Sequence, residues 1–183
     1  MPTLHYLTVP TLTSGLQTLK HVITKATTNT PSTLDISKLP EMRLAPDMLT
    51  FKTQIQIACS EAHKILFRLG KANPSGATGE LPSFFPAFKD NETTVEDLVS
   101  RIDATIKDLD ACKEGDLRDE NVKVDLKLGP LQTQMTGTDY VLGYILPDFF
   151  FHLQTAYCIL RMNGVEIGKK DYLQAFMSKT VSL

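Results

Sequence analysis

Apolar residues recur at helical spacing in four long stretches of this chain. Most of the intervals are three or four residues, which places the apolar side chains of each stretch on one face of an α-helix. The stretches run from Leu12 to Ala26, from Met48 to Leu69, from Val95 to Leu109 and from Val141 to Ile159. Helices of this kind bury their apolar faces against one another, so the pattern predicts an all-α four-helix bundle.

The start of each stretch carries residues that favour the first turn of a helix. The predicted starts are Pro10, Pro46–Asp47, a capping box from Thr93 to Glu96, and Thr138–Asp139. Pro147 lies inside the fourth stretch, where it should kink the helix and free the carbonyl group of Gly143.

Residues 121–135 follow a different period. Val122, Val124 and Leu126 alternate with lysine and aspartate, and Gly129–Pro130 then turns the chain back. Alternation of this kind around a tight turn predicts a small β-hairpin, inserted before the last long helix.

Composition limits the kind of protein this chain can be. The 183 residues include 19 basic and 21 acidic side chains, so no strongly basic surface is available for nucleic acid. No run approaches the roughly 20 apolar residues that cross a bilayer, and no signal peptide is evident. The 3 cysteines form no CxxC pair and are expected to be reduced thiols. The composition therefore predicts a single cytoplasmic domain, residues 1–183, with neither nucleic acid nor membrane as a partner.

The segment from Leu146 to Tyr157 combines an apolar run with two ionisable side chains. Asp148 and His152 lie four residues apart, so they share one face of a helix. Three consecutive phenylalanines predict that this segment is buried, and a buried polar pair needs a partner. Three interpretations of His152 remain open. It is a core residue bonded to Asp148 or to a helix carbonyl, a metal ligand, or an acid/base catalyst that Asp148 orients.

Several motifs carry a resemblance to a known family. They are Arg43–Met48, Gln54–Ala58, Glu92–Thr94, Arg101–Ile102, Leu146–His152, Thr155–Tyr157, Ile159–Arg161, Asn163–Val165 and Gly168–Lys169. The chain resembles, over roughly residues 7–173, a family of uncharacterised bacterial and fungal proteins in the DinB/YfiT-like superfamily. That superfamily consists of four-helix bundles, often called metalloenzymes and commonly dimeric.

The resemblance implies a place for a metal. Many members hold a divalent ion with one histidine on the second helix and two histidines, four residues apart, on the last long helix. The corresponding positions here are Gln56, Asp148 and His152. Glutamine is a weak ligand for zinc or nickel, so the implied cofactor is either none or a weakly bound divalent metal.

The resemblance also implies a homodimer. The long crossover 71–92 supports the same expectation, because it contains Phe84, Phe85 and Phe88. A single copy of the chain would have to cover three large apolar side chains in one connector.

The sequence therefore predicts a small-molecule-binding or interaction protein without the three-histidine metal site. Its expected pocket lies between the second and fourth helices and is lined by Gln56, His63, Asp148 and His152, with Tyr144 as a wall. The alternative function is an enzyme, either a metal-assisted thiol or group transferase or a metal-free acid/base catalyst using His152 with Asp148.

Arg43 is a further candidate. It either forms an ion pair with Asp47 at the start of the second helix or binds a ligand carboxylate.

Overall fold

The computed structural model describes residues 2–73, 78 and 90–178, and within them the chain is mostly helical. The helices are α1 (Leu4–Thr28), α2 (Phe51–Leu69), α3 (Val95–Ala111), α4 (Gly137–Tyr140), α5 (Leu146–Met162) and α6 (Lys169–Met177). A π-helical turn, Val141–Ile145, joins α4 to α5, and short 3₁₀ helices occupy Ile36–Glu41 and Glu114–Asp116. The strands are β1 (Lys123–Leu128) and β2 (Leu131–Thr136).

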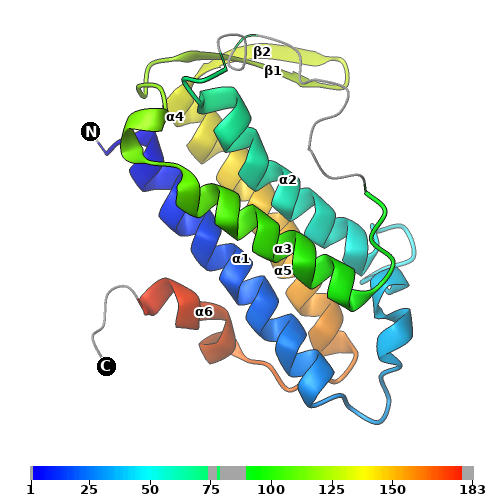
Figure 1. Cartoon of the computed structure of the whole chain (residues 1–183). Helices are drawn as coiled ribbons and strands as arrows, with labels where there is room; N and C mark the ends of the chain where they lie inside the picture. Colours follow the sequence, from blue (N-terminus) through cyan, green and yellow to red (C-terminus); the bar gives the residue numbers. More distant parts are fainter. Residues whose placement is uncertain (1, 74–77, 79–89, 179–183) are drawn as a thin grey trace.

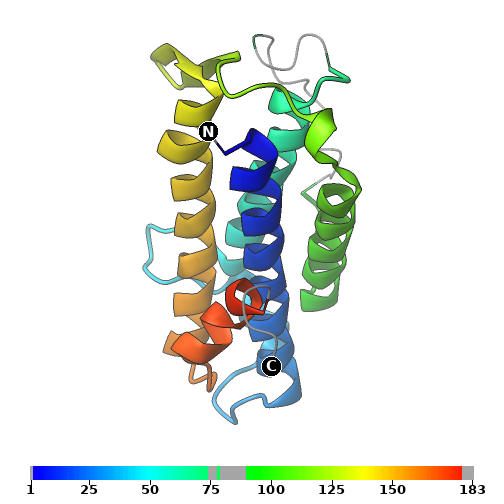
Figure 2. The ribbon, with the colours of Figure 1, turned by 90° about the vertical axis from the view of Figure 1, so that its left-hand side faces the viewer.

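Helices α1, α2, α3 and α5 pack lengthwise against one another, as the two views in Figures 1 and 2 show. Their inward faces form one apolar core, in which Leu12, Leu16, Ile55, Ile102 and Phe149 are fully buried. Gly15 of α1 packs tightly against α5, because an added Cβ atom there would lie 2.4 Å from the Phe149 ring. No helix of the described residues is long and apolar enough to span a membrane.

The predicted hairpin is confirmed. Strands β1 and β2 are antiparallel, with Lys123 opposite Thr136 and Leu128 opposite Leu131, and they lie across one end of the long helices (Figure 1). Gly129 adopts the left-handed conformation, with φ of +57°, that the tight turn requires. The phenylalanines at 84, 85 and 88 lie outside the described residues.

Two predicted helix starts need correction. Helix α1 begins at Leu4 with Thr3 as its cap, so Pro10 lies inside the helix and not in its first turn. Helix α2 begins at Phe51, because the hydroxyl of Thr50 caps it, and Pro46 and Asp47 belong to the preceding connector.

The capping box of α3 is shifted by one residue from the prediction. Thr94 Oγ1 accepts from the backbone of Asp97 at 3.1 Å, and the Asp97 carboxylate accepts from the backbone of Thr94 at 3.0 Å. Thr93–Glu96 and Thr94–Asp97 both fit the capping pattern, and the sequence alone does not separate them.

Pro147 is accommodated by the π-helical turn just before it. The backbone N–H of Leu146 donates to the carbonyl of Val141, five residues earlier, so the wider turn ends where the proline lacks its own N–H. The chain thus runs from Gly137 to Met162 as one continuous helical rod that carries Tyr144, Asp148 and His152.

Helix α6 covers the outside of α1. Thr18 Oγ1 donates to the carbonyl of Tyr172 at 3.0 Å, and Asp171 pairs with His21 and Lys25, each at 3.0 Å. The segment after Gly168 therefore packs on the surface of the long helices.

Candidate functional site

His152 is fixed by a hydrogen-bond relay from α2. Its Nδ1 lies 2.6 Å from Gln54 Oε1, and Gln54 Nε2 donates to the carbonyl oxygen of Leu49 at 3.1 Å. Because the amide nitrogen of Gln54 serves Leu49, its oxygen must accept from the ring, so Nδ1 carries the proton. Burial lowers the pKa of His152 against the opposing charge of Asp148, with a smaller contribution from Lys64, and the neutral ring therefore presents Nε2 as an acceptor.

Asp148 lies near this acceptor nitrogen. His152 Nε2 and Asp148 Oδ1 are 3.7 Å apart, which is beyond hydrogen-bonding distance. The structure therefore corrects the sequence-based choice of partner, because Gln54 and not Asp148 bonds the ring. Asp148 is less buried than His152, with 32% of its side chain exposed.

Glu61 of α2 completes a group of acceptors that the sequence did not indicate. Its side chain is only 2% exposed, and Oε1 forms an ion pair with Lys64. Its second oxygen, Oε2, is buried and has no hydrogen-bond partner among the described residues. Burial raises the pKa of Glu61 to about 7, against the opposing charge of Lys64 and with the help of the Asp148 carboxylate. Once protonated, the Glu61 carboxyl can donate to Asp148.

Lys64 and Tyr144 border this group. The Lys64 ammonium lies 5.8 Å from the centroid of the Tyr144 ring, within the range of a cation–π contact. Burial, together with the charge of Glu61, raises the pKa of the Tyr144 hydroxyl, so it remains a neutral donor at physiological pH. We call Glu61, Asp148 and His152 the acceptor cluster, because each presents an acceptor atom to the space between α2 and α5.

Gln56 and His63 belong to a different face of α2. Gln56 Nε2 donates to Glu92 at 2.8 Å, while His63 contacts the Cys59 carbonyl at 3.1 Å and Asp108 of α3 at 2.9 Å. The predicted convergence of Gln56 and His63 with Asp148 and His152 is therefore wrong.

Two polar stripes with the same seven-residue spacing explain that error. Gln54 and Glu61 form one stripe of α2 and face α5, whereas Gln56 and His63 form the other and face α3. The sequence identified the period but not which of the two stripes faces the last long helix.

Arg43 has a local structural partner. Its Nη1 donates to the carbonyl of Met48 at 3.3 Å, and within the described residues no ion pair joins it to Asp47. The expected ion pair is therefore corrected to a hydrogen bond that closes the connector before α2.

The residues of this site do not fit a divalent metal as they are arranged. The part of the chain that the structure describes contains no group of three or more histidine, cysteine, aspartate or glutamate side chains placed to hold one. Of the three candidate ligands, Gln56 is bonded to Glu92 on the far face of α2. The Glu61 carboxylate could take the place of Gln56 as a ligand, but it already pairs with the Lys64 ammonium. A metal ion beside this positive charge would be repelled.

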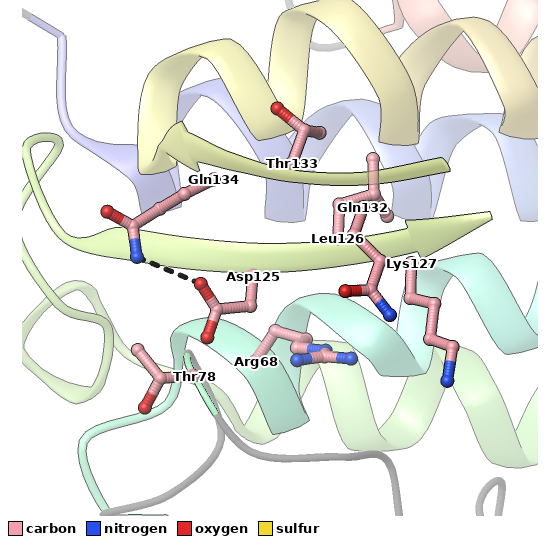
Figure 3. A pocket seen from close by; sticks show the side chains of 8 residues that line it. All are labelled: Arg68, Thr78, Asp125, Leu126, Lys127, Gln132, Thr133 and Gln134. Atoms are coloured by element: carbon pink, nitrogen blue, oxygen red, sulfur yellow. Dashed lines mark hydrogen bonds between the residues drawn. The ribbon is translucent and has the colours of Figure 1, made fainter. Parts of the chain in front are cut away.

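A separate hollow of about 430 Å³ lies between the hairpin and the end of α2 (Figure 3). Arg68 reaches toward it from α2, and Asp125 and Gln134 line it from the two strands. Gln134 Nε2 donates to Asp125 Oδ1 at 2.9 Å, a cross-strand bond that fixes both side chains. This hollow is far along α2 from Gln54, and none of the candidate site residues predicted from the sequence lines it.

Comparison with known proteins identifies the class of fold. The chain is similar to the crystal structure of a DinB family member from Shewanella denitrificans, with 30% sequence identity and a TM-score of 0.76. The similarity covers 93% of this chain and 91% of that one. No curated protein matches the sequence.

Residues 4–173 match the family described as a domain of unknown function, DUF1993. The protein belongs to this family.

Proposed function

We propose that this protein is a four-helix bundle of DinB/YfiT-like type that binds a small molecule at the acceptor cluster, without a three-histidine metal site. One observation carries the proposal. Glu61 Oε2 is buried and has no hydrogen-bond partner among the described residues. In the ionised form of Glu61 this oxygen lacks a donor, which costs about 1–3 kcal/mol, so a ligand that donates to it gains affinity.

The chemistry of the cluster limits the ligand. Two carboxylates and the acceptor nitrogen of His152 lie together, so the ligand must bring hydrogen-bond donors. Asp148 and Lys64 are both partly exposed, so the cluster is reached by solvent at these two side chains.

Titration of isotope-labelled protein with neutral and cationic donor molecules tests this assignment. Saturable shifts of the His152 ring signals are expected, with affinity reduced at least fivefold by Glu61→Gln. The matched control is Glu41→Gln, which changes an exposed glutamate paired with Lys52. A ligand whose affinity is unchanged by Glu61→Gln and His152→Ala binds elsewhere and contradicts the proposal.

A second candidate function is metal-free acid/base catalysis, with His152 as the base and Asp148 beside it. The pKa of about 7 for Glu61 favours it, because such a carboxyl exchanges protons readily near neutral pH. A reaction that depends on the cluster would show a pH–rate profile with an inflection near pH 7, lost in Glu61→Gln. A profile unchanged by that substitution rules out this role for Glu61.

We further propose that the protein is cytoplasmic and holds no tightly bound transition metal. Cys59, Cys112 and Cys158 are free thiols, which is typical of reducing compartments. Elemental analysis should find far less than one zinc or nickel per chain. One metal per chain, lost on His152→Ala, would contradict the metal-free assignment.

A homodimer is proposed on the resemblance to the superfamily. Leu142 and Phe151, on the rod that carries the site, are more than half exposed and are available for such an interface.

A further inference from the structure

One cationic side chain, that of Lys64, lies among the acceptors of the site. The Lys64 ammonium contacts Glu61 directly and lies over the Tyr144 ring, while Asp148 lies beside Glu61. Lysine supplies three donors on one nitrogen, and an ammonium of this kind satisfies several acceptors at once. The lysine therefore shows which chemical group the cluster accommodates.

We infer that the acceptor cluster is a cage for a primary ammonium group, and that Lys64 occupies this cage from within the chain. The inference rests on the proposed ligand-binding function and names the class of its ligand. An external amine would replace the Lys64 ammonium at Glu61, next to Asp148, and Lys64 would turn outward into water.

Charge favours an ammonium over other ligands. An anionic ligand would face the carboxylates of Glu61 and Asp148, and a neutral donor would leave their charge unbalanced once Lys64 departs. A primary ammonium brings one positive charge, several donors, and a cation that fits the face of Tyr144.

Lys64 is able to leave the cage. Its side chain is 21% exposed, whereas the Glu61 side chain that it contacts is 2% exposed, so the ammonium lies on the solvent side of the buried carboxylate. A flexible four-carbon stem allows the head group to move without a change in the helix. Because Lys64 is tethered, it competes with external amines at an effective concentration on the order of millimolar or higher.

Removing this internal competitor tests the inference. The probe is n-butylammonium, which carries the alkyl chain and head group of lysine, and the variant is Lys64→Met, which keeps the stem and removes the charge. We expect n-butylammonium to bind Lys64→Met at least tenfold more tightly than the parent protein, measured from the His152 ring signals. The double variant Lys64→Met, Asp148→Asn should lose this gain.

Matched probes separate charge from donors. Tetramethylammonium has the charge without N–H donors, and n-butanol has the chain without the charge, so neither should show the tenfold gain. Equal binding of n-butylammonium to parent and Lys64→Met overturns the inference. Binding of Zn²⁺ or Mg²⁺ by Lys64→Met, without binding of n-butylammonium, also overturns the ammonium assignment and makes the cage a metal site.

Two further measurements cover other outcomes. If circular dichroism shows that Lys64→Met is unfolded, Lys64→Gln replaces it, and the parent must still give saturable His152 shifts at high n-butylammonium. Absence of those shifts contradicts the inference. If a neutral donor binds the parent through Glu61 while the amine shows no gain in the variant, the ammonium inference fails and the proposed binding function stands.

Discussion

At the scale of single residues, the most unusual group is the carboxyl of Glu61. Its pKa of about 7 in the folded protein exceeds the ordinary value of 4.5, so the folded state holds a proton that the unfolded state releases. The stabilisation from this proton is complete below about pH 4.5 and is lost as the pH rises through about 7. The shift corresponds to about 3 kcal/mol, at about 1.4 kcal/mol per pKa unit.

Glu61→Gln should therefore make stability less dependent on pH. The amide cannot ionise, and its N–H₂ group can donate to Asp148 as the protonated acid does. We expect the fall in unfolding free energy between pH 5 and pH 8 to shrink by roughly 1–3 kcal/mol, measured by urea denaturation. Glu41→Gln, at an exposed position, serves as the control. An unchanged pH profile in Glu61→Gln would mean that Glu61 is ionised throughout this range.

His152→Ala should destabilise the fold whether or not the ring has a chemical role. The ring is buried, and its removal leaves a cavity and deprives Gln54 Oε1 of its donor. Each effect costs about 1–3 kcal/mol. His152→Asn should cost less than His152→Ala, because its amide N–H₂ can replace the Nδ1 donor, and Asp148→Asn should cost less again. If His152→Ala unfolded in urea like the parent protein, the hydrogen-bond relay from Leu49 would contribute nothing to the unfolding free energy.

At the scale of elements, the contact between α1 and α5 depends on Gly15. A methyl group there would overlap the Phe149 ring, at 2.4 Å from its nearest atom. In an exposed helix, glycine to alanine gains up to about 1 kcal/mol, but a clash in a packed core costs about 1–3 kcal/mol. We expect Gly15→Ala to lower the unfolding free energy and the melting temperature.

Gly143→Ala is the matched control for Gly15→Ala. An added Cβ atom at Gly143 meets only the flexible end of Met135, at 3.5 Å, which is an ordinary contact. This substitution should leave the melting temperature unchanged or raise it. If both variants melt alike, then helices α1 and α5 separate easily and the close approach at Gly15 is unimportant.

Arg101 joins three segments of the chain. Its side chain is fully buried, and its guanidinium bonds Asp90, Glu92 and the Gln56 carbonyl of α2 at 2.7–3.2 Å. Loss of one partner from such a buried pair costs about 3–5 kcal/mol, because Glu92 keeps an uncompensated charge. Arg101→Met should therefore lower stability in urea far more than Lys20→Met, which breaks an exposed pair with Asp103 and should cost under about 1 kcal/mol. Similar losses in both variants would show that the Arg101 contacts are no stronger than a surface ion pair.

The helical period and the hairpin were predictable because each depends on neighbours in sequence. Alternation around Gly129 is enough to indicate two strands, and apolar spacing is enough to indicate long helices. The site was predictable only on α5, where Asp148 and His152 share a face.

Glu61 and Gln54 were missed because the sequence does not say which stripe of α2 faces α5. That choice depends on how the helices rotate during packing, which is decided by the whole core. Lys64 was missed for a second reason: a lysine one turn after a glutamate is also typical of an exposed helix surface.

At the scale of the whole molecule, the proposed homodimer predicts the mass in solution. The chain mass is 20.3 kDa, and sedimentation at tens of micromolar should give a species of about twice this value. Phe151→Glu, at an exposed position of α5, should shift the equilibrium toward the single chain, whereas Tyr6→Glu, exposed near the N-terminus, is the control. A 20.3 kDa species at this concentration would refute the dimer.

The π-helical turn before Pro147 bears on how chain length can vary in this fold. A turn of this type holds one residue more than an ordinary helical turn, and it absorbs that residue locally. The helix before it and the helix after it therefore keep their directions, and Asp148 and His152 keep facing α2. A deletion of one residue between 141 and 145 would convert the wide turn to an ordinary one and leave the site unchanged. A deletion of one residue between Asp148 and His152 would instead rotate these two side chains apart by about 100° around the helix axis. Alignments of homologous chains should accordingly tolerate a gap at the first place and not at the second.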